Sequence, residues 1–290
     1  AYKEPADQLI VVDDASSDGS EGVAREFGAE VLRLGGGPHG PAFARNRGAE
    51  VAKRDVLVFV DADVVVHADT LDRIRYHLGD HPHVAALFGS YDDDPPHRTL
   101  VSRYKNLLHH YVHQQGKREA STFWAGCGAV RRDVFMELGG FNEGYRRPSI
   151  EDIELGARLR RGGYNVWLCR NVQVTHLKRW TLKSLLRADI FDRAIPWTLL
   201  MMQAGRVPTD LNLDLASRLS AFLAWCAVAL AALGFWSPWC LLGCIGALAG
   251  VACLNRRLYR FFAAKGGAGF TAGAVGLHFL YLLYSSVTFG

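Results

Sequence analysis

Asp61-Ala62-Asp63 places two carboxylates one residue apart, directly after the apolar run from Val56 to Val60. Carboxylates at this spacing repel each other unless a cation binds between them, and the sequence offers Asp61 and Asp63 no other evident counter-charge. Mg²⁺ binds one or two carboxylates together with phosphate oxygens. The pattern therefore predicts a divalent cation that carries a diphosphate, although a bare D-x-D also arises often by chance.

A second acidic pair, Asp13 and Asp14, follows the apolar run Leu9-Ile10-Val11-Val12 and precedes a Ser- and Gly-rich segment. Carboxylates at the end of a strand can accept hydrogen bonds from a base or a ribose, whereas they would repel phosphate. Asp and Ser are also common residues of turns and helix N-termini. A nucleoside contact and local turn chemistry therefore both stay open.

The segments around these acids alternate between strand-like and helix-like patterns. Short apolar runs indicate buried strands, which we expect at 9–12, 31–32, 56–60 and 84–88. Capping and stop residues indicate helices, which we expect at 17–27, 41–53, 70–78 and 100–113. This alternation predicts an α/β domain with a mainly parallel sheet flanked by helices. Ligands of such sheets bind beyond the carboxyl ends of the strands, where both acidic pairs lie.

Five segments, taken in order, resemble the inverting glycosyltransferases of family 2. They are VVDDASSDGS (11–20), ARNRG (44–48), VFVDADV (58–64), GGFNEGY (139–145) and IEDIELGARLRRGGY (150–164). Their order and spacing make the resemblance specific, and it covers roughly residues 9–180. The family has the GT-A fold, a nucleotide-diphosphosugar-binding α/β domain. The resemblance therefore implies this fold and a UDP-, GDP- or dTDP-sugar as the donor.

The resemblance also implies roles for the acids that follow the strands. Asp14, or else Asp13, would hold the nucleoside, and Asp61 would bind the ribose or the metal. Asp63 would ligate Mg²⁺ or Mn²⁺.

Glu151-Asp152 matches the family's acidic pair at the start of a helix. By the family pattern, Asp152 is the base that deprotonates the acceptor hydroxyl as it attacks the anomeric carbon opposite the leaving nucleotide. Glu151 would lie beside it on the acceptor side. The alternative is that both acids merely favour a helix N-terminus.

His176-Leu177-Lys178-Arg179-Trp180 has the spacing of the Q-x-x-R-W motif of processive family members, with His in place of Gln. The resemblance suggests Arg179 near the diphosphate and Trp180 near the acceptor. His176 would complete the metal shell or contact the diphosphate, and its replacement of Gln puts processivity in doubt. A His after a strand is also commonly structural, and Lys178 and Arg179 could be ordinary juxtamembrane cations.

Trp124 lies in a segment of small residues, Thr122 to Gly128, that precedes a helix expected to open at Arg131-Arg132-Asp133. Small residues allow close approach of a sugar to the backbone, and Trp124 could stack on that sugar. A buried turn explains the segment nearly as well.

Three runs near the C-terminus, 219–235, 239–254 and 270–289, contain no Asp, Glu, Lys or Arg. A transmembrane helix needs about 20 mostly apolar residues, so we expect about three such helices, the second being the shortest. Residues 179–200 mix cations with large apolar side chains, which is typical of a helix in the membrane interface or of one packed on the soluble domain. The expected order is a GT-A domain in 1–178, an amphipathic interface segment in 179–212 and a transmembrane region in 213–290.

The net charge of +4 does not indicate nucleic-acid binding, because the cations lie beside the apolar runs rather than in a stripe interleaved with aromatics. Basic flanks mark the cytoplasmic side of membrane segments. We therefore expect a multi-pass protein of the cell (inner) membrane, with the catalytic domain in the cytosol and the Ser237-Pro238 turn outside. The flanking cations are Lys178, Arg179, Lys183, Arg187, Arg193, Arg206, Arg218, Arg256, Arg257, Arg260 and Lys265.

The N-terminus departs from the family pattern. Family members usually begin with an apolar strand and a Pro-x-Tyr-Asn-like segment that grips the base, whereas only eight residues precede Leu9. We expect either that the sequence is clipped here or that the protein has lost part of its nucleotide site.

Together these features predict a metal-dependent, inverting, membrane-associated glycosyltransferase. It would move a sugar from a nucleotide-diphosphate donor to a lipid-linked or membrane-proximal glycan acceptor, in contact with membrane lipids. One alternative is a polyprenyl-phosphate glycosyl synthase, which uses the lipid phosphate itself as nucleophile. The other is a non-catalytic membrane protein that binds nucleotide sugars, against which the intact Asp61, Asp63 and Asp152 argue.

Overall fold

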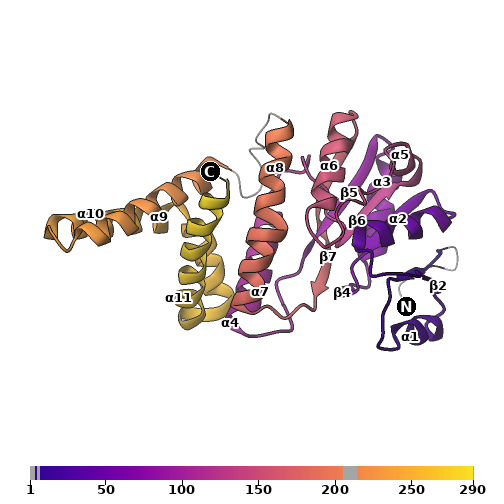
Figure 1. Cartoon of the computed structure of the whole chain (residues 1–290), viewed down its shortest axis with the longest axis horizontal. Coiled ribbons are helices and arrows are strands. Elements are labelled where there is room, and N and C mark those ends of the chain that lie inside the picture. The colour runs from indigo at the N-terminus through magenta and orange to yellow at the C-terminus, as the bar shows by residue number, and fades with distance from the viewer. Residues whose placement is uncertain (1–3, 5–6, 205–213, 290) are drawn as a thin grey trace. The chain divides into compact units, whose positions relative to one another are not determined.

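The computed structural model describes residues 4, 7–204 and 214–289. The chain forms two compact units, each of which draws on two stretches of sequence. The first comprises Ala1–Ser90 and Lys117–Thr175, and the second comprises Tyr91–Gly116 and His176–Gly290. The domain boundaries expected at residues 178 and 212 stay predictions. Figure 1 labels the elements in chain order.

The first unit opens with a pair of parallel strands, β1 (Ile10–Asp13) and β2 (Glu30–Arg33), joined through helix α1 (Ser20–Glu26). Helix α2 (Pro41–Val51) follows and begins with a proline, whose fixed φ suits the first turn of a helix. These elements agree with the strands and helices expected in this part of the sequence.

A five-stranded sheet forms the centre of the first unit, in the order β3-β6-β5-β7-β4. Its strands are β3 (Val56–Val60), β4 (Val64–Val66), β5 (Val84–Tyr91), β6 (Cys127–Arg131) and β7 (Asn165–His176). Because β6 runs antiparallel to both β3 and β5, the expectation of a mainly parallel sheet needs correction here. Cys127 pairs with Val60, so β6 enters the sheet at the carboxyl end of β3 instead of returning through a crossover helix.

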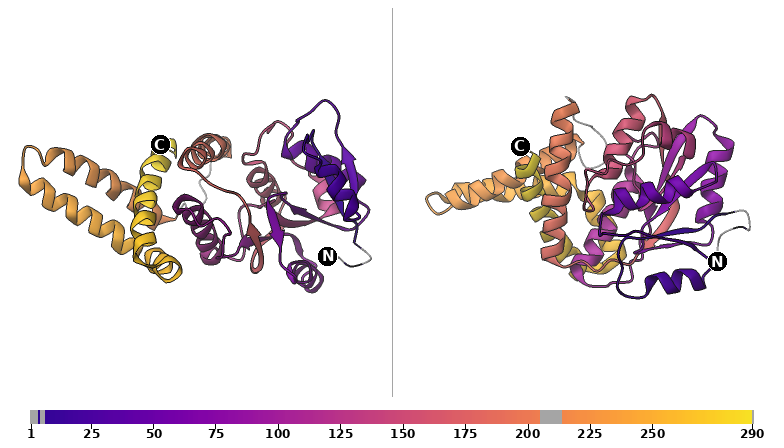
Figure 2. Two further views of the ribbon diagram at one scale, coloured as in Figure 1. Left: turned by 90° about the horizontal axis from the view of Figure 1, so that it is seen from below. Right: turned by 45° about the vertical axis from the view of Figure 1, so that its right-hand side comes forward.

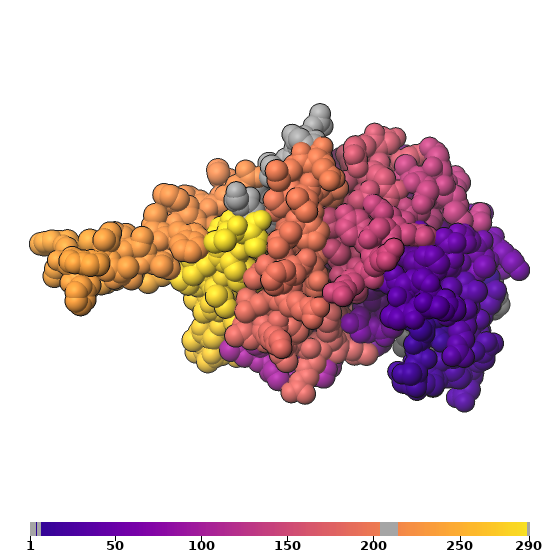
Figure 3. All heavy atoms as spheres, in the orientation of Figure 1, coloured from indigo at the N-terminus to yellow at the C-terminus, as the bar shows by residue number. Residues whose placement is uncertain are grey.

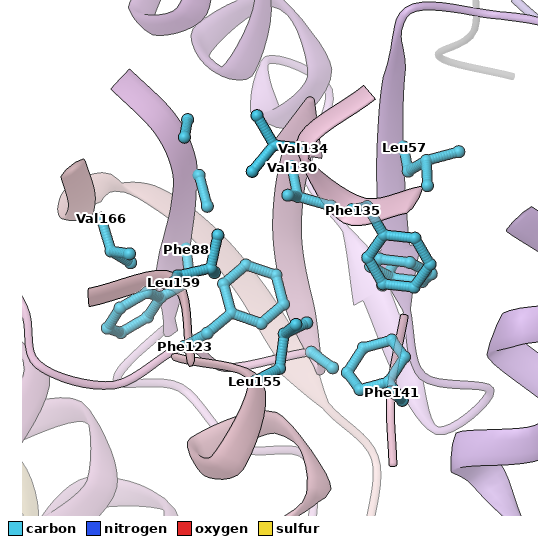
Figure 4. Packing of buried hydrophobic residues seen from close by; sticks show 14 of the residues in the cluster. Leu57, Phe88, Phe123, Val130, Val134, Phe135, Phe141, Leu155, Leu159 and Val166 are labelled. Carbon is cyan, nitrogen blue, oxygen red and sulfur yellow. The ribbon is translucent and has the colours of Figure 1, made fainter. Parts of the chain in front are cut away.

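Helices α3 (Thr70–Asp80), α5 (Arg132–Glu137) and α6 (Glu151–Arg161) complete the first unit. Its core joins sheet residues to α5 and α6, as Figure 4 shows around Phe88, Phe135 and Leu155. The Phe135 and Phe141 rings meet at an angle of 66° with centroids 5.4 Å apart. Burying side chains of this size contributes about 1.5–3 kcal/mol each, so this core fixes the start of α6 relative to the sheet.

The second unit is helical. Its helices are α4 (Leu100–Gln115), α7 (Leu182–Arg187), the π-helix η1 (Ala188–Ala194), α8 (Ile195–Ala204), α9 (Leu215–Leu233), α10 (Pro238–Leu254) and α11 (Arg256–Phe289). One apolar core joins α4, α7 and α11, and includes Tyr104, Leu185 and Phe262. A smaller core joins α9, α10 and α11. Residues 182–204 are thus helical, whereas 205–213 of the expected interface segment lie outside the described residues.

All three apolar runs are helical, and α9 and α11 are each long and apolar enough to cross a membrane. Helix α10 is shorter, with 17 residues, which agrees with the expectation that the second run forms the shortest of the three helices. Large apolar side chains on α9 and α10 are exposed, among them Phe222, Trp239 and Ile245; the atoms of these two helices are orange in Figure 3. Whether these helices cross a membrane several times stays a prediction.

Candidate functional site

The first unit places Asp61 and Asp63 on one tight turn at the carboxyl end of β3. The backbone N–H of Val64 donates to the Asp61 carbonyl at 3.0 Å, which closes the turn into β4. The Asp61 N–H donates to the Gly126 carbonyl at 3.3 Å. Both side chains are half-buried. The turn therefore holds the two carboxylates close together at the edge where ligands of α/β sheets bind.

Asp61 has a counter-charge, and the expectation that it lacks one is wrong. Arg45 Nη2 of α2 lies 2.6 Å from Asp61 Oδ1, and Arg45 Nη1 lies 2.8 Å from Glu151 Oε1. Burial alone would lower the pKa of the Arg45 guanidinium, but the charges of Asp61 and Glu151 raise it overall. Arg45 therefore stays charged and joins the turn after β3 to the first residue of α6.

Glu151 and Asp152 open α6, as expected, but their surroundings differ. Glu151 is buried, and its second oxygen accepts a hydrogen bond from the Ser149 N–H at 2.9 Å. Asp152 is half-buried, and its Oδ2 accepts from the Ala125 N–H at 3.2 Å. Because Arg45 and Ser149 occupy both oxygens of Glu151, this residue joins parts of the fold, whereas Asp152 lies beside the loop that carries Trp124.

Trp124 packs partly against the core of the first unit. A Cβ added at Gly126 would approach the indole Cζ2 to 2.5 Å, so only glycine leaves room for the ring there. The segment from Thr122 to Gly128 is thus packed as the buried turn that was the alternative explanation for its small residues. Contact of Trp124 with a sugar stays a prediction.

Asp14 holds the loop that leads into α2. Its carboxylate accepts hydrogen bonds from the backbone N–H groups of His39, at 2.8 Å, and Gly40, at 2.7 Å. Burial would raise the pKa of the Asp14 carboxyl, but these hydrogen bonds outweigh that effect and lower it. Asp13 accepts from the Ser16 N–H at 2.9 Å. Both acids thus carry out the turn chemistry that the sequence left open, and a nucleoside contact stays a prediction.

The second unit contains the remaining three residues expected to bind ligands. His176 is buried, stacks on Tyr91 with ring centroids 4.3 Å apart, and has its Nδ1 2.7 Å from Asn106 Oδ1. Because Asn106 Nδ2 donates to the Ser102 carbonyl, the amide oxygen faces the imidazole and His176 Nδ1 is the donor. A histidine that binds a metal through Nε2 commonly donates its Nδ1–H in this way.

Trp180 and Arg179 differ in exposure although they are adjacent. The Trp180 side chain is part of the second unit's core, and the Trp180 backbone N–H donates to Ser102 Oγ at 2.8 Å. Arg179 is exposed. The buried position of Trp180 favours a packing role, and the roles suggested by the Q-x-x-R-W spacing stay predictions.

The structure joins Asp61 to Glu151 through Arg45, a link that was not predicted from the sequence. The residue was visible in the ARNRG segment, but its spacing from Glu151 gives no sign of their contact. Among the described residues, no three His, Cys, Asp or Glu side chains are grouped to hold a metal ion. A cation at the Asp61 turn would therefore need ligands from a bound molecule, as Mg²⁺ commonly takes from phosphates.

Comparison with known proteins finds similarity to glycosyltransferases. Residues 1–139 match the family model described as Glycosyl transferase family 2. The chain is 24% identical over 206 residues to the O-antigen chain rhamnosyltransferase RfbN of Salmonella typhimurium, covering 66% of this chain and 65% of that protein. It is 31% identical over 197 residues to the pre-mycofactocin glycosyltransferase of Mycobacterium tuberculosis, covering 63% of this chain and 40% of that protein.

A solved structure shares the fold. The mannosyltransferase PcManGT from Pyrobaculum calidifontis, in complex with GDP-Man and Mn²⁺, matches with a TM-score of 0.54 and 19% identity, over 97% of this chain and 77% of that one. The GT-A type α/β domain followed by a helical region is thereby confirmed.

Proposed function

We propose that this chain, which carries a glycosyl transferase family 2 domain in residues 1–139, transfers a sugar with inversion from a nucleotide-diphosphate donor to an acceptor at a membrane. The observation that carries the proposal is the Arg45 bridge. It fixes the acids of the β3 turn against the acidic pair that opens α6. In the proposed reaction, one set of acids acts on the donor and the other on the acceptor, and the Arg45 bridge would hold the two sets at a constant separation.

Mg²⁺ or Mn²⁺ fits the turn after β3. Asp61 and Asp63 are hard oxygen ligands on one short turn, and such cations complete their coordination with water and substrate phosphates. When bound, the cation would neutralise charge on the leaving nucleoside diphosphate. Arg45 engages one oxygen of Asp61, which leaves that carboxylate one oxygen for a cation, and Asp63 on the same turn would ligate the cation with it. The Pyrobaculum mannosyltransferase was solved with GDP-Man and Mn²⁺, which is in line with a divalent cation as the cofactor.

Asp152 is the proposed base. Its Oδ2 accepts a hydrogen bond from the Ala125 backbone N–H and its Oδ1 accepts one from the Ile153 N–H, and together these orient the carboxylate. It would take the proton of the acceptor hydroxyl as that oxygen attacks the anomeric carbon. Glu151 would position α6 through Arg45 and would not itself take the proton.

The acceptor is a lipid-linked or membrane-proximal glycan in this proposal. Helices α9 and α11 are long and apolar enough to cross a membrane, which would keep the domain near such acceptors. An O-antigen chain rhamnosyltransferase is among the relatives. We place the catalytic domain on the cytosolic side of the cell (inner) membrane, in line with the basic flanks of the apolar helices.

The test is transfer by the full chain in membranes, using a panel of radiolabelled UDP-, GDP- and dTDP-sugars. We expect one donor to label a lipid-extractable glycan, and Asp152→Asn to abolish most of the labelling. Label on the lipid phosphate itself would favour the polyprenyl-phosphate glycosyl synthase. Donor binding without transfer from any donor would contradict the proposed activity and favour a binding protein.

A further inference from the structure

Helix α11 is broken at Gly267, and the break separates a cationic part from an apolar part. Gly267 has φ 71° and ψ −176°, a conformation outside the helical region that glycine adopts readily. Four cations lie before the break, whereas residues 268–289 contain no Asp, Glu, Lys or Arg. The second part has 22 residues, close to the length that spans a bilayer.

Helix α4 holds the break in place. The Arg103 guanidinium donates a hydrogen bond to the carbonyl of Lys265, just before Gly267. The same guanidinium lies over the Phe270 ring, 4.8 Å from its centroid. The last carbonyls of a helix have no partner within that helix, so Arg103 satisfies one that the break exposes. The bend, which can be followed along the yellow helix in Figure 2, is thus part of the packed second unit.

The cationic part of α11 has a packed face and an opposite charged face. At about 100° per residue, Arg256, Arg257 and Arg260 fall within an arc of about 100°. Leu258 and Phe262 project to the other side, where they are buried in the core that includes α4. The three arginines are exposed.

The three arginines differ from the fourth cation in their partners. Lys265 Nζ forms an ion pair with Asp93 at 2.5 Å. Within residues 4, 7–204 and 214–289, Arg256, Arg257 and Arg260 form no ion pair with a carboxylate. An exposed set of unpaired guanidinium groups beside a long apolar helix lacks a counter-charge from the described chain.

We propose that Arg256, Arg257 and Arg260 bind anionic phospholipid headgroups, an inference that rests on the membrane insertion of α11 in the proposed function. Cations next to a membrane-spanning helix lie at the depth of the headgroups, where each strengthens binding to anionic lipid about fivefold. The planar guanidinium group also donates two parallel hydrogen bonds to a phosphate. The three arginines should therefore bind an anionic phospholipid headgroup more strongly than a headgroup with no net charge.

The experiment compares lipids retained by the full chain after extraction from nanodiscs of mixed phosphatidylglycerol and phosphatidylcholine. We expect the wild type to retain phosphatidylglycerol in preference, and higher salt to weaken that retention by screening. The triple change R256Q/R257Q/R260Q should lower the retention at least about tenfold. The change R256K/R257K/R260K, which keeps the charge, should retain most of it.

A matched control removes three exposed cations of the first unit, as K53Q/R54Q/R161Q, and should leave lipid retention unchanged. Equal retention by the Gln triple variant and the wild type, or equal retention of the two lipids by the wild type, overturns the inference. Thermal unfolding close to that of the wild type excludes misfolding as the cause of a loss.

Two further readouts separate this inference from the proposed function. Donor binding by the Gln triple variant should match that of the wild type, because the Asp61 turn belongs to the first unit. If alkaline carbonate extracts the wild-type chain from membranes, the membrane part of the proposed function fails, and this inference fails with it. If the chain stays inserted but shows no preference for phosphatidylglycerol, only the inference fails.

Discussion

Arg45 Nη2 lies 2.6 Å from Asp61 Oδ1, so a cation of α2 neutralises one of the two carboxylates of the β3 turn. The other amino group of the same guanidinium binds Glu151 at 2.8 Å. The Glu151 side chain is only 6% exposed and that of Asp61 is 34% exposed. The bridge therefore gives Asp61 and Glu151 a shared protein cation and joins the turn after β3 to the start of α6.

Removing the charge of Arg45 should destabilise the first unit. Arg45→Gln would leave the buried Glu151 carboxylate without its cation, and breaking a buried pair on one side costs about 3 kcal/mol. We expect a lower midpoint of thermal unfolding and weaker donor binding. Arg45→Lys should recover part of the stability, because an ammonium group can hold only one of the two acids well.

Arg47→Gln is the matched control for this change on the same helix. Arg47 pairs with Glu143 at 2.7 Å, but its side chain is 33% exposed, and such pairs contribute about 1 kcal/mol or less. Equal destabilisation by the two Gln substitutions would show that the Arg45 bridge contributes no more to the stability than the Arg47 pair does.

Strands with a continuous apolar run are predicted well from the sequence. Strands that are stabilised mainly by pairing with neighbouring strands are predicted less well. Val56 to Val60 forms β3 with the expected bounds. Strand β6 (Cys127–Arg131) is not predicted from the sequence, because Gly and Ala have weak strand preference and only pairing with β3 and β5 stabilises them as a strand. Strand β4 has three residues, too few for a periodic pattern.

The candidate site shows the same limit. Acids at strand ends were found because a buried strand and a following acid are adjacent in sequence. The partner of Asp61 was missed because Arg45 belongs to a helix earlier in the chain, and the ion pair depends on how α2 packs on the sheet. Likewise, the two backbone donors that hold Asp14 come from residues 39 and 40, and sequence spacing does not indicate such a contact.

Donor binding should depend on a divalent cation through Asp63. We expect Asp63→Ala to abolish the Mn²⁺- or Mg²⁺-dependent part of nucleotide-sugar binding. Asp61→Asn should weaken it less, because Arg45 already shares that carboxylate. Calorimetric titration of the donor with Mn²⁺ and with EDTA measures both effects. Equal affinity in Mn²⁺ and in EDTA for the wild type would rule out a metal at this turn.

Stability should depend on pH through Asp14. Hydrogen bonds from His39 and Gly40 lower the pKa of this carboxyl in the folded chain below its usual 3.8. A lowered pKa contributes stability above the unfolded value, and the contribution is lost as the pH falls through the folded value. We expect Asp14→Asn to destabilise by about 1–2 kcal/mol at pH 7, and the difference from the wild type to shrink below about pH 4.

The measurement for Asp14 is the midpoint of thermal unfolding of both proteins over a pH series. Asp80→Asn, at an exposed position that ends α3, serves as control and should show little difference at any pH. A gap between Asp14→Asn and the wild type that stays constant down to the lowest pH would contradict the assigned role of the charge.

Membrane topology can be tested at Ser237, the residue that precedes α10. The basic flanks predict that this turn lies outside, whereas Asn255 lies on the cytosolic side. A cysteine at position 237, in a chain with its native cysteines replaced, should react with an impermeant reagent added to intact cells. A cysteine at position 255 should react only after the membrane is opened, and the reverse pattern would invert the proposed orientation.

Asp152 should act in the turnover step and do little for donor binding. Its oxygens accept backbone hydrogen bonds from Ala125, on the loop that carries Trp124, and from Ile153, whereas Glu151 shares the Arg45 guanidinium with Asp61. Asp152→Asn keeps the size of the side chain but removes its basicity. General-base catalysis contributes about 10²–10⁴-fold to the rate, so we expect a loss of that size in turnover with nearly unchanged donor affinity.

Glu151→Gln provides the comparison for the base. It weakens the Arg45 bridge, so we expect reduced thermal stability and a smaller loss of turnover than in Asp152→Asn. Turnover and donor affinity measured side by side for both variants decide the assignment. Near-normal turnover in Asp152→Asn would make Glu151 the leading candidate for the base, and a loss of donor affinity as large as that of Asp63→Ala would place Asp152 on the donor side of the site instead.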